Sequence, residues 1–290
     1  VRVHFRSEGF FPIDTIPLAF SVTNLSTSVT VTHRDTVYRS MTLGDTATYT
    51  FTPKADLSAF SNYHIYAWSE APGDPNLNND TIGFKFIEHI VPITGFPAIE
   101  TFDGPGWVAG NGSAGNAGTF NTVNWEVYPA SNSGEFAWMV GNDLTVTTGT
   151  GPRWSWKRND GNYIYAEGSY GSNSPAALFR TVKCVDLTGL TNPTLSFWYY
   201  LYGSDINILN VQVVPNGSNN WQTVAGAPLV GQKHLTEISD WKFQMVDLSA
   251  YVGQVIKIRI LARKIGGGDK ADMAIDDLVI YDRPATDLGV

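Results

Sequence analysis

The sequence predicts an all-β protein, an antiparallel β-sandwich followed by a larger two-sheet jelly roll. Short segments in which apolar and polar residues alternate recur along the chain, which is the pattern of strands with one buried face. Turn residues separate these segments, and the apolar period of a capped helix is not seen. Hydrophobic residues make up 43% of the chain and charged residues 16%, which favours packed cores over disorder.

The first domain is expected at residues 1–91. Turn signals lie at 43–46 (LGDT) and 71–80 (APGDPNLNND), and 54–63 predicts one short turn of helix at most. The spacing of the alternating segments suits an antiparallel sandwich. Strands are expected at 1–5, 18–24, 28–34, 47–53, 64–70 and 81–86.

The second domain is expected at residues 92–283. PITGFP (92–97) marks a linker or first corner, and residues 104–121 are rich in Gly, Asn and Ser. The domain is too long for a seven-stranded immunoglobulin unit, whereas its strand number suits a two-sheet jelly roll. Strands are expected at 162–168, 176–182, 194–203, 209–215, 221–225, 243–249, 255–264 and 273–282.

Composition and motifs argue against several classes of function. The net charge is −8 and cations are scattered, so nucleic acid is not an expected partner. The apolar runs are too short for membrane insertion. The lone Cys184 cannot form an intrachain disulfide and is expected to be a buried, inert thiol. Histidines are scattered, and no nucleophile-elbow, zinc-protease or phosphate-loop motif occurs, so we expect no enzyme.

A set of motifs in the second domain resembles the MAM family (the meprin/A5/receptor-phosphatase adhesion module). The most specific are LSFWYYLYG (195–203) and AIDDLVI (274–280), which stand in the order that the family has. The resemblance covers roughly residues 98–282. The other matching segments are FDGPGW (102–107), NWEVYP (124–129), TGTGP (148–152), GNYIYAEGS (161–169), WQTV (221–224) and SDWKFQMVDLS (239–249).

The resemblance implies a jelly roll used in adhesion and protein–protein contact rather than in catalysis. Animal members carry paired cysteines that this chain lacks, so it is closer to the MAM-like and cleaved-adhesin modules of bacterial surface proteins, often from Bacteroidota. The first domain resembles the CARDB-type bacterial immunoglobulin-like module, through LGDTATYTF (43–51) and DPNLNNDT (74–81). The expected fold is therefore an Ig-like β-sandwich followed by a MAM-like jelly roll.

Adjacent carboxylates in AIDDLVI are the main candidate for a metal site. Asp276 and Asp277 should point to opposite faces of a strand, so that one faces inward and needs a partner. Asp103 lies in the expected opening strand, which such jelly rolls place beside the last one. Ca²⁺ takes six to eight oxygens, and Asp143 and carbonyls of the 104–121 loop are expected to complete a structural calcium site. The alternative is that these carboxylates bind no metal and instead accept hydrogen bonds from backbone N–H groups or from Arg153.

The loop GPRWSWKRNDG (151–161) is the candidate for a ligand or partner surface. Trp154 and Trp156 share one face if this segment is extended, and with Arg153 they form a ledge for a sugar ring or a partner side chain. In the alternative, which we favour, the loop folds over the sandwich with its Trp residues packed inside.

The aromatic run LSFWYYLYG predicts a central strand. Ser196, Trp198, Tyr200 and Tyr202 should line one face and Leu195, Phe197, Tyr199 and Leu201 the other. Of these, Leu195, Phe197 and Leu201 should face the core.

These observations together predict a non-enzymatic adhesion or structural segment of a large, repetitive extracellular or cell-surface protein. The alternative is a carbohydrate-binding accessory pair of a secreted enzyme. Residues 284–290 (PATDLGV) are expected to be a linker and the first strand of a following Ig-like domain, although a disordered tail would also account for them. The expected partners are modules of the same array or identical copies, which would build a stalk or filament, and a cell-surface protein or glycan.

Overall fold

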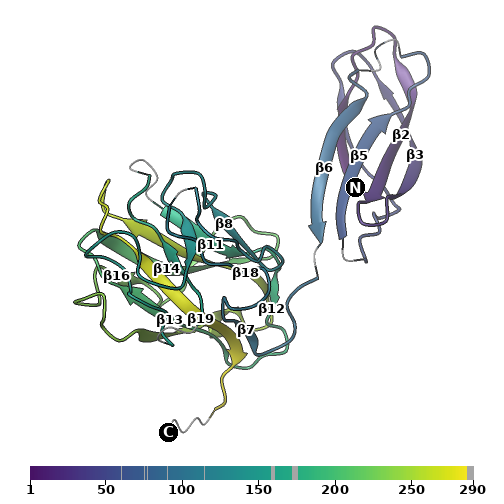
Figure 1. Ribbon diagram of the computed structural model, residues 1–290. Coiled ribbons are helices and arrows are strands. Elements are labelled where there is room, and N and C mark those ends of the chain that lie inside the picture. The colour runs from purple at the N-terminus through teal and green to yellow at the C-terminus, as the bar shows by residue number, and fades with distance from the viewer. Residues whose placement is uncertain are drawn as a thin grey trace. The chain divides into compact units, whose positions relative to one another are not determined.

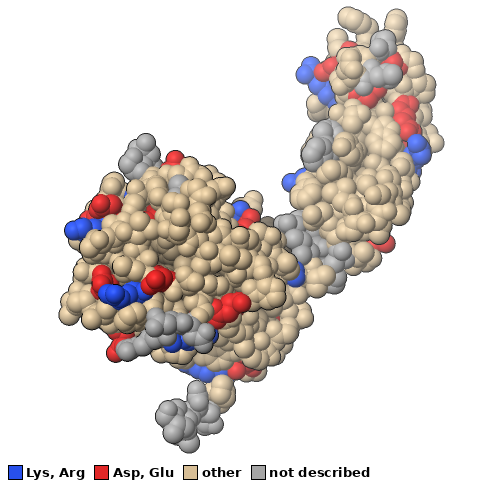
Figure 2. Space-filling view, viewed as in Figure 1, with Lys and Arg blue, Asp and Glu red and all other residues tan. Residues whose placement is uncertain are grey.

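The computed structural model describes residues 1–59, 61–74, 76, 78–89, 91–113, 115–157, 161–171 and 176–285. The chain divides into two compact units, Val1–Val91 and Pro92–Val290 (Figure 1). Both units are built from β-strands, which confirms the all-β prediction, and one 3₁₀ turn lies at Ser249–Tyr251. Lys and Arg side chains lie close to Asp and Glu side chains at several places on the visible face (Figure 2).

The first unit is a β-sandwich of a four-stranded and a two-stranded sheet. The larger sheet has the order β3-β2-β5-β6, and the smaller one pairs β1 with β4 in antiparallel register. Buried side chains of both sheets, among them Phe20, Met41, Phe51 and Tyr63, form its core. The strands are β1 (Arg2–Arg6), β2 (Ile13–Asn24), β3 (Val29–Met41), β4 (Thr46–Thr50), β5 (Ser61–Ser69) and β6 (Thr81–His89).

The second unit is a two-sheet jelly roll. The six-stranded sheet has the order β17-β13-β19-β10-β9, with β7 also paired to β19. Its strands are β7 (Ala98–Glu100), β9 (Trp138–Gly141), β10 (Tyr163–Ala166), β13 (Pro193–Leu201), β17 (Lys242–Asp247) and β19 (Met273–Asp282).

The seven-stranded sheet forms the other layer of the jelly roll. Its order is β15-β14-β18-β11-β8, with β12 paired to β18 and β16 paired to β14. Its strands are β8 (Trp125–Tyr128), β11 (Ala176–Thr181), β12 (Val185–Asp186), β14 (Ile206–Pro215), β15 (Gln222–Thr223), β16 (Leu229–Val230) and β18 (Val255–Lys264).

Strand β13 is buried on both faces, which explains the aromatic run of its sequence. Leu195, Phe197 and Leu201 pack in the core between the two sheets, as the period-two pattern predicts. On the opposite face, Tyr200 is buried in a second cluster with Trp241 and other aromatic residues. A strand with two buried faces has no need of polar residues at alternate positions.

Several expected elements differ in extent. The opening strand is β7, which ends before the 102–107 segment where the sequence places it, and residues 102–107 form bends and turns instead. Strands at 138–141, 185–186 and 229–230 were not expected, because two to four residues are too few to show a period. No helical turn occurs in the described residues of 54–63.

Candidate functional site

A β-bulge in β19 determines where the two adjacent aspartates point. Trp198 pairs with Asp276, but Ser196, two residues earlier in β13, pairs with Val279, three residues later in β19. One extra residue is therefore accommodated in β19. Asp277 has a φ of 45°, in the left-handed region that Asp tolerates better than most residues.

The bulge corrects the expectation that Asp276 and Asp277 face opposite sides of the sheet. Ile275 and Leu278 both lie in the core, so the two-residue alternation is interrupted between them. Both carboxylates instead meet the same loop: the indole Nε1 of Trp156 donates to Asp277 Oδ2 at 2.8 Å, and the backbone N–H of Trp156 donates to Asp276. The site thus lies on the outer side of the six-stranded sheet.

Lys157 joins the first-strand region to the last strand. Its Nζ lies 3.2 Å from Asp277 Oδ1 and 3.5 Å from Asp103 Oδ2. Asp103 Oδ1 also accepts a hydrogen bond from the backbone N–H of Asn162 at 2.6 Å. Asp103 therefore lies near Asp276 and Asp277, as predicted, and the positive charge that faces these carboxylates is that of Lys157. Arg153, which the sequence offered for that role, pairs with Glu237 at 3.2 Å instead.

Asp276 is the buried member of the group, with 1% of its surface exposed. Its Oδ1 accepts a hydrogen bond from the N–H of Asp277 at 2.8 Å. Burial raises the pKa of Asp276 to about 8, and the neighbouring charge of Asp277 adds to the effect. A carboxyl group in this state takes up either a proton or a cation at neutral pH.

Asp143 stands apart from this arrangement. Its carboxylate is in an exposed residue and accepts a hydrogen bond from the adjacent N–H of Leu144 at 2.8 Å. Its backbone carbonyl, rather than its carboxylate, is tied to the sheet, because it accepts a hydrogen bond from the Tyr163 hydroxyl. Its role as a ligand stays a prediction.

The 151–157 segment does not form the shared tryptophan ledge. It consists of bends and a turn, so Trp154 and Trp156 are not aligned by an extended backbone. The Trp156 ring stacks on Trp198 with 4.5 Å between centroids and 11° between planes. Trp154 is half-buried, its carbonyl accepts a hydrogen bond from the indole of Trp241, and the Arg153 guanidinium lies 5.8 Å from its ring. The packing alternative describes this loop better.

A second buried acidic pair, Glu167 and Asp272, was not predicted from the sequence. Both residues are fully buried. Asp272 Oδ1 accepts from the N–H of Gly168 and Glu167 Oε1 from the N–H of Ser169. Burial, and then the charge of Glu167, raise the pKa of Asp272 well above its usual value. The feature of the sequence that could have indicated this pair is Glu167, the acidic residue that ends GNYIYAE directly after a strand of buried residues.

The fold and the site together define a two-sheet jelly-roll module. Its last strand, β19, carries an acidic group that lies near the region of its first strand, β7. Residues 119–285 match the family model of the MAM domain, meprin/A5/mu, which covers more than half of the chain. The chain therefore belongs to the MAM domain family. The resemblance of residues 1–91 to the CARDB-type module stays a prediction.

Several solved structures of other proteins are similar to parts of this chain at low sequence identity. The K3 cleaved adhesin domain of Lys-gingipain from Porphyromonas gingivalis W83 is 18% identical over 54% of this chain and 91% of its own, with a TM-score of 0.33. The CBM22-1 xylan-binding domain of Paenibacillus barcinonensis Xyn10C is 13% identical over 64% and 94%, with a TM-score of 0.35. TmCBM61, solved with β-1,4-galactotriose, is 19% identical over 53% and 95%, with a TM-score of 0.30. The ligands named are those of the other proteins.

Helices long and apolar enough to cross a membrane are absent from the part of the chain that the structure describes.

Proposed function

We propose that this chain is a non-enzymatic binding and structural segment of an extracellular or cell-surface protein, joined to further modules or copies by strand addition. Membership of the MAM family supports a role in contacts between proteins. The observation that carries the proposal is the free edge of β1 in the first unit, because an unpaired strand edge is a template for another strand.

Strand β1 uses only one of its edges within the described residues. Val1 O accepts a hydrogen bond from the N–H of Phe51, and Ser7 N–H donates to Asp45 O, so the odd-numbered residues face β4. In an antiparallel ladder the intervening residues point the other way. The backbone groups of Arg2, His4 and Arg6 therefore face the free edge.

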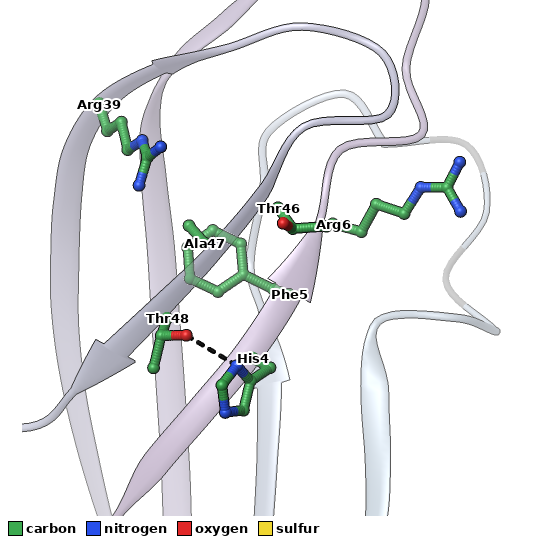
Figure 3. Close-up of a pocket in the computed structure, with 7 residues that line it drawn as sticks. All are labelled: His4, Phe5, Arg6, Arg39, Thr46, Ala47 and Thr48. Carbon is green, nitrogen blue, oxygen red and sulfur yellow. Dashed lines mark hydrogen bonds between the residues drawn. The ribbon is translucent and has the colours of Figure 1, made fainter.

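The inner side of this edge leaves apolar surface half covered. Val1 and Phe5 pack on the core of the first unit but are only half-buried. On the β4 side of β1 lies an open hollow of about 640 Å³ (Figure 3), which Phe5 and Ala47 line together with Arg39 of β3. A strand added at the free edge would place its inward side chains next to the half-buried Val1 and Phe5.

The segment 284–290 of a second copy, or a segment like it in a neighbouring module, fits this edge. In PATDLGV the apolar Leu288 and Val290 alternate with Asp287 and Gly289, as in a strand with one buried face. Asp287 is complementary in charge to the basic residues of β1. Residues 286–290 lie outside the described residues, so their conformation is part of the proposal.

Titration of the full chain with a fluorescent PATDLGV peptide tests the proposal. We expect saturable binding that weakens with added salt. A control peptide with Leu288→Ser and Val290→Ser has the same charge but no apolar side chains to pack beside Val1 and Phe5, and should not bind. Absence of binding, or equal binding of both peptides, would contradict strand addition.

Calcium at Asp103, Asp276 and Asp277 is a further part of the proposed function. The structure supports it by charge, since three carboxyl groups face one ammonium group, and by chemistry, since carboxylate oxygens are the ligands that Ca²⁺ prefers. Bound there, the ion would neutralise the group and hold the first-strand region against β19. Such an ion stabilises a module without any role in catalysis.

A thermal scan with calcium and with chelator measures this effect. Calcium at 100 times its dissociation constant should add about 2.7 kcal/mol to the free energy of unfolding of the second unit. Asp277→Asn should abolish the difference, whereas Asp143→Asn should keep it unless Asp143 is a ligand. Identical melting curves of the unaltered chain in both conditions would exclude calcium.

The carbohydrate-binding alternative finds little support at Trp154 and Trp156. Trp198 already covers one face of the Trp156 ring, so that face is not available to a sugar. Trp154→Ala and Trp156→Ala are therefore not expected to abolish retention on a glycan gel. A carbohydrate-binding role would need another surface of the jelly roll.

A further inference from the structure

The outer face of the seven-stranded sheet carries a row of polar side chains that crosses the strands. Each of five neighbouring strands contributes one residue, and each residue is directly opposite the next in the register. With about 4.8 Å between strands, the row is roughly 19 Å long. Its members are Glu126, Arg180, Arg259, Gln212 and Thr223.

Hydrogen bonds fix the side chains of this polar row. Arg180 Nε donates to Glu126 Oε1 at 2.7 Å, and Arg259 Nε donates to Gln212 Oε1 at 2.8 Å. Gln212 Nε2 lies 3.3 Å from Thr223 Oγ1. Each arginine is thus held through Nε, and its terminal nitrogens have no hydrogen-bond partner among the described residues. Two oriented guanidinium groups with free terminal donors make a site for an anion.

The polar row carries an excess of positive charge on a chain whose net charge is −8. Arg180 and Arg259 are direct cross-strand neighbours, an unfavourable like-charge pair that an anion would relieve. Arg263 lies four residues further along the same face of β18, and Glu126 is the one carboxylate in the row. Burial, and then the charges of Arg180 and Arg263, lower the pKa of Arg259.

Aromatic and apolar side chains border the polar row. The Arg259 guanidinium lies 4.3 Å from the ring centroid of Trp221, which supports its position. Tyr128, two residues after Glu126 on the same face, is 63% exposed and pairs with Leu178. An exposed aromatic ring beside planar polar groups is a surface on which a sugar ring stacks.

We propose that this face binds an acidic polysaccharide, a chain rich in hexuronate carboxylates, which lies across the strands. The terminal nitrogens of Arg180 and Arg259, with Arg263, would take the carboxylates, and Tyr128 would stack on a sugar ring. The length of the row suits several sugar units of an extended chain. This binding site goes beyond the proposed strand addition and does not depend on it, because the two surfaces belong to different units.

Isothermal titration of the full chain with uronate tetrasaccharides tests the inference. Tetramers of galacturonate, mannuronate and guluronate are the probes, and a neutral tetramer of galactose is the control ligand. We expect at least one uronate to bind and the neutral tetramer to bind at least tenfold more weakly. The affinity should fall as salt rises, because the contact is between charges.

Variants on and off the face locate the site. Arg180→Gln, Arg263→Gln and Tyr128→Ala should each weaken binding about tenfold, the scale of one charged contact. Arg283→Gln and Tyr38→Ala make the same changes at exposed positions elsewhere and should leave it unchanged. Circular dichroism checks that each variant is folded.

Three results would overturn the inference. One is a lack of binding by every uronate tetramer. The second is binding that survives the combined Arg180→Gln and Arg263→Gln changes, which would place the site elsewhere. The third is binding of a polyglutamate peptide in place of the uronates, which would make the face a docking surface for acidic proteins.

Discussion

At the scale of single residues, the second unit keeps several ionisable groups neutral by burying them. His234 is an example with a specific structural role. It is 2% exposed, its ring stacks on Tyr200 with 4.1 Å between centroids, and its Nδ1 accepts a hydrogen bond from the N–H of Leu201 at 2.9 Å. Protonation of Nδ1 would remove this acceptor. Burial accordingly lowers the pKa of His234 from 6.5 to about 4.

The lowered pKa predicts that His234 destabilises the second unit in acid. Between pH 6.5 and about 4 the unfolded chain binds a proton that the folded chain does not, so the free energy of unfolding falls as pH falls, by about 3 kcal/mol at most. Urea unfolding at pH 7 and pH 4.5 measures it. His234→Asn has no titrating ring and should show a smaller loss over this range. An equal loss in both proteins would mean that His234 is not responsible.

Phe197 tests the packing of the core at one position. It is 1% exposed and lies between the two sheets. Phe197→Ala should lower the free energy of unfolding of the second unit by about 3–5 kcal/mol, through lost burial and the cavity that remains. Phe243→Ala, at a position that is 47% exposed, is the matched control and should cost much less. A cost below about 1 kcal/mol at Phe197 would place its face in solvent.

At the scale of elements, sequence patterns predicted the long strands and not the local irregularities. β13, β18 and β19 are nine or ten residues long, so their periods and apolar content are clear in the sequence. β12 and β16 have two residues each, and their pairing depends on neighbours distant in the chain. The bulge at Asp277 also depends on the partner strand, which is why the orientation of Asp276 and Asp277 was predicted wrongly.

In the candidate site, too, the features that follow from strand order were predicted and those that depend on a loop were not. The nearness of Asp103 to the aspartate pair follows from strand order and was predicted. Lys157 as the counter-charge and the stacking of Trp156 on Trp198 depend on how a loop folds over the sheet, and no periodic pattern encodes that.

Strand β5 of the first unit carries a tyrosine that ties it to the preceding loop. Tyr63 is buried at the start of the strand, and its hydroxyl donates to the carbonyl of Ala59 at 2.6 Å, the geometry of the tyrosine corner of immunoglobulin-like sandwiches. Tyr63→Phe should cost about 1 kcal/mol, which lowers the melting temperature of a unit of this size by about 4–8 °C. Calorimetry measures it. If every melting transition of the variant stayed at the temperature of the unaltered chain, the hydrogen bond would not stabilise the first unit.

At the scale of the whole molecule, the two units offer different surfaces for contacts. The first unit offers a strand edge with basic residues, and the second offers a cationic sheet face and an acidic site. A segment built in this way can join other modules through its backbone while its second unit binds a ligand. The central claim is that β1 accepts a further strand, because this would cover an edge whose apolar residues Val1 and Phe5 are only half covered by the described residues.

Amide hydrogen exchange at β1 tests that claim most directly. The measurement compares the full chain alone with the chain in the presence of excess PATDLGV peptide. Val3 and Phe5, whose backbone groups face β4, are internal controls and should exchange slowly in both samples. The account predicts that the amides of Arg2, His4 and Arg6 exchange rapidly in the chain alone and become protected when the peptide is added. Rapid exchange of these three amides at a saturating peptide concentration would contradict it.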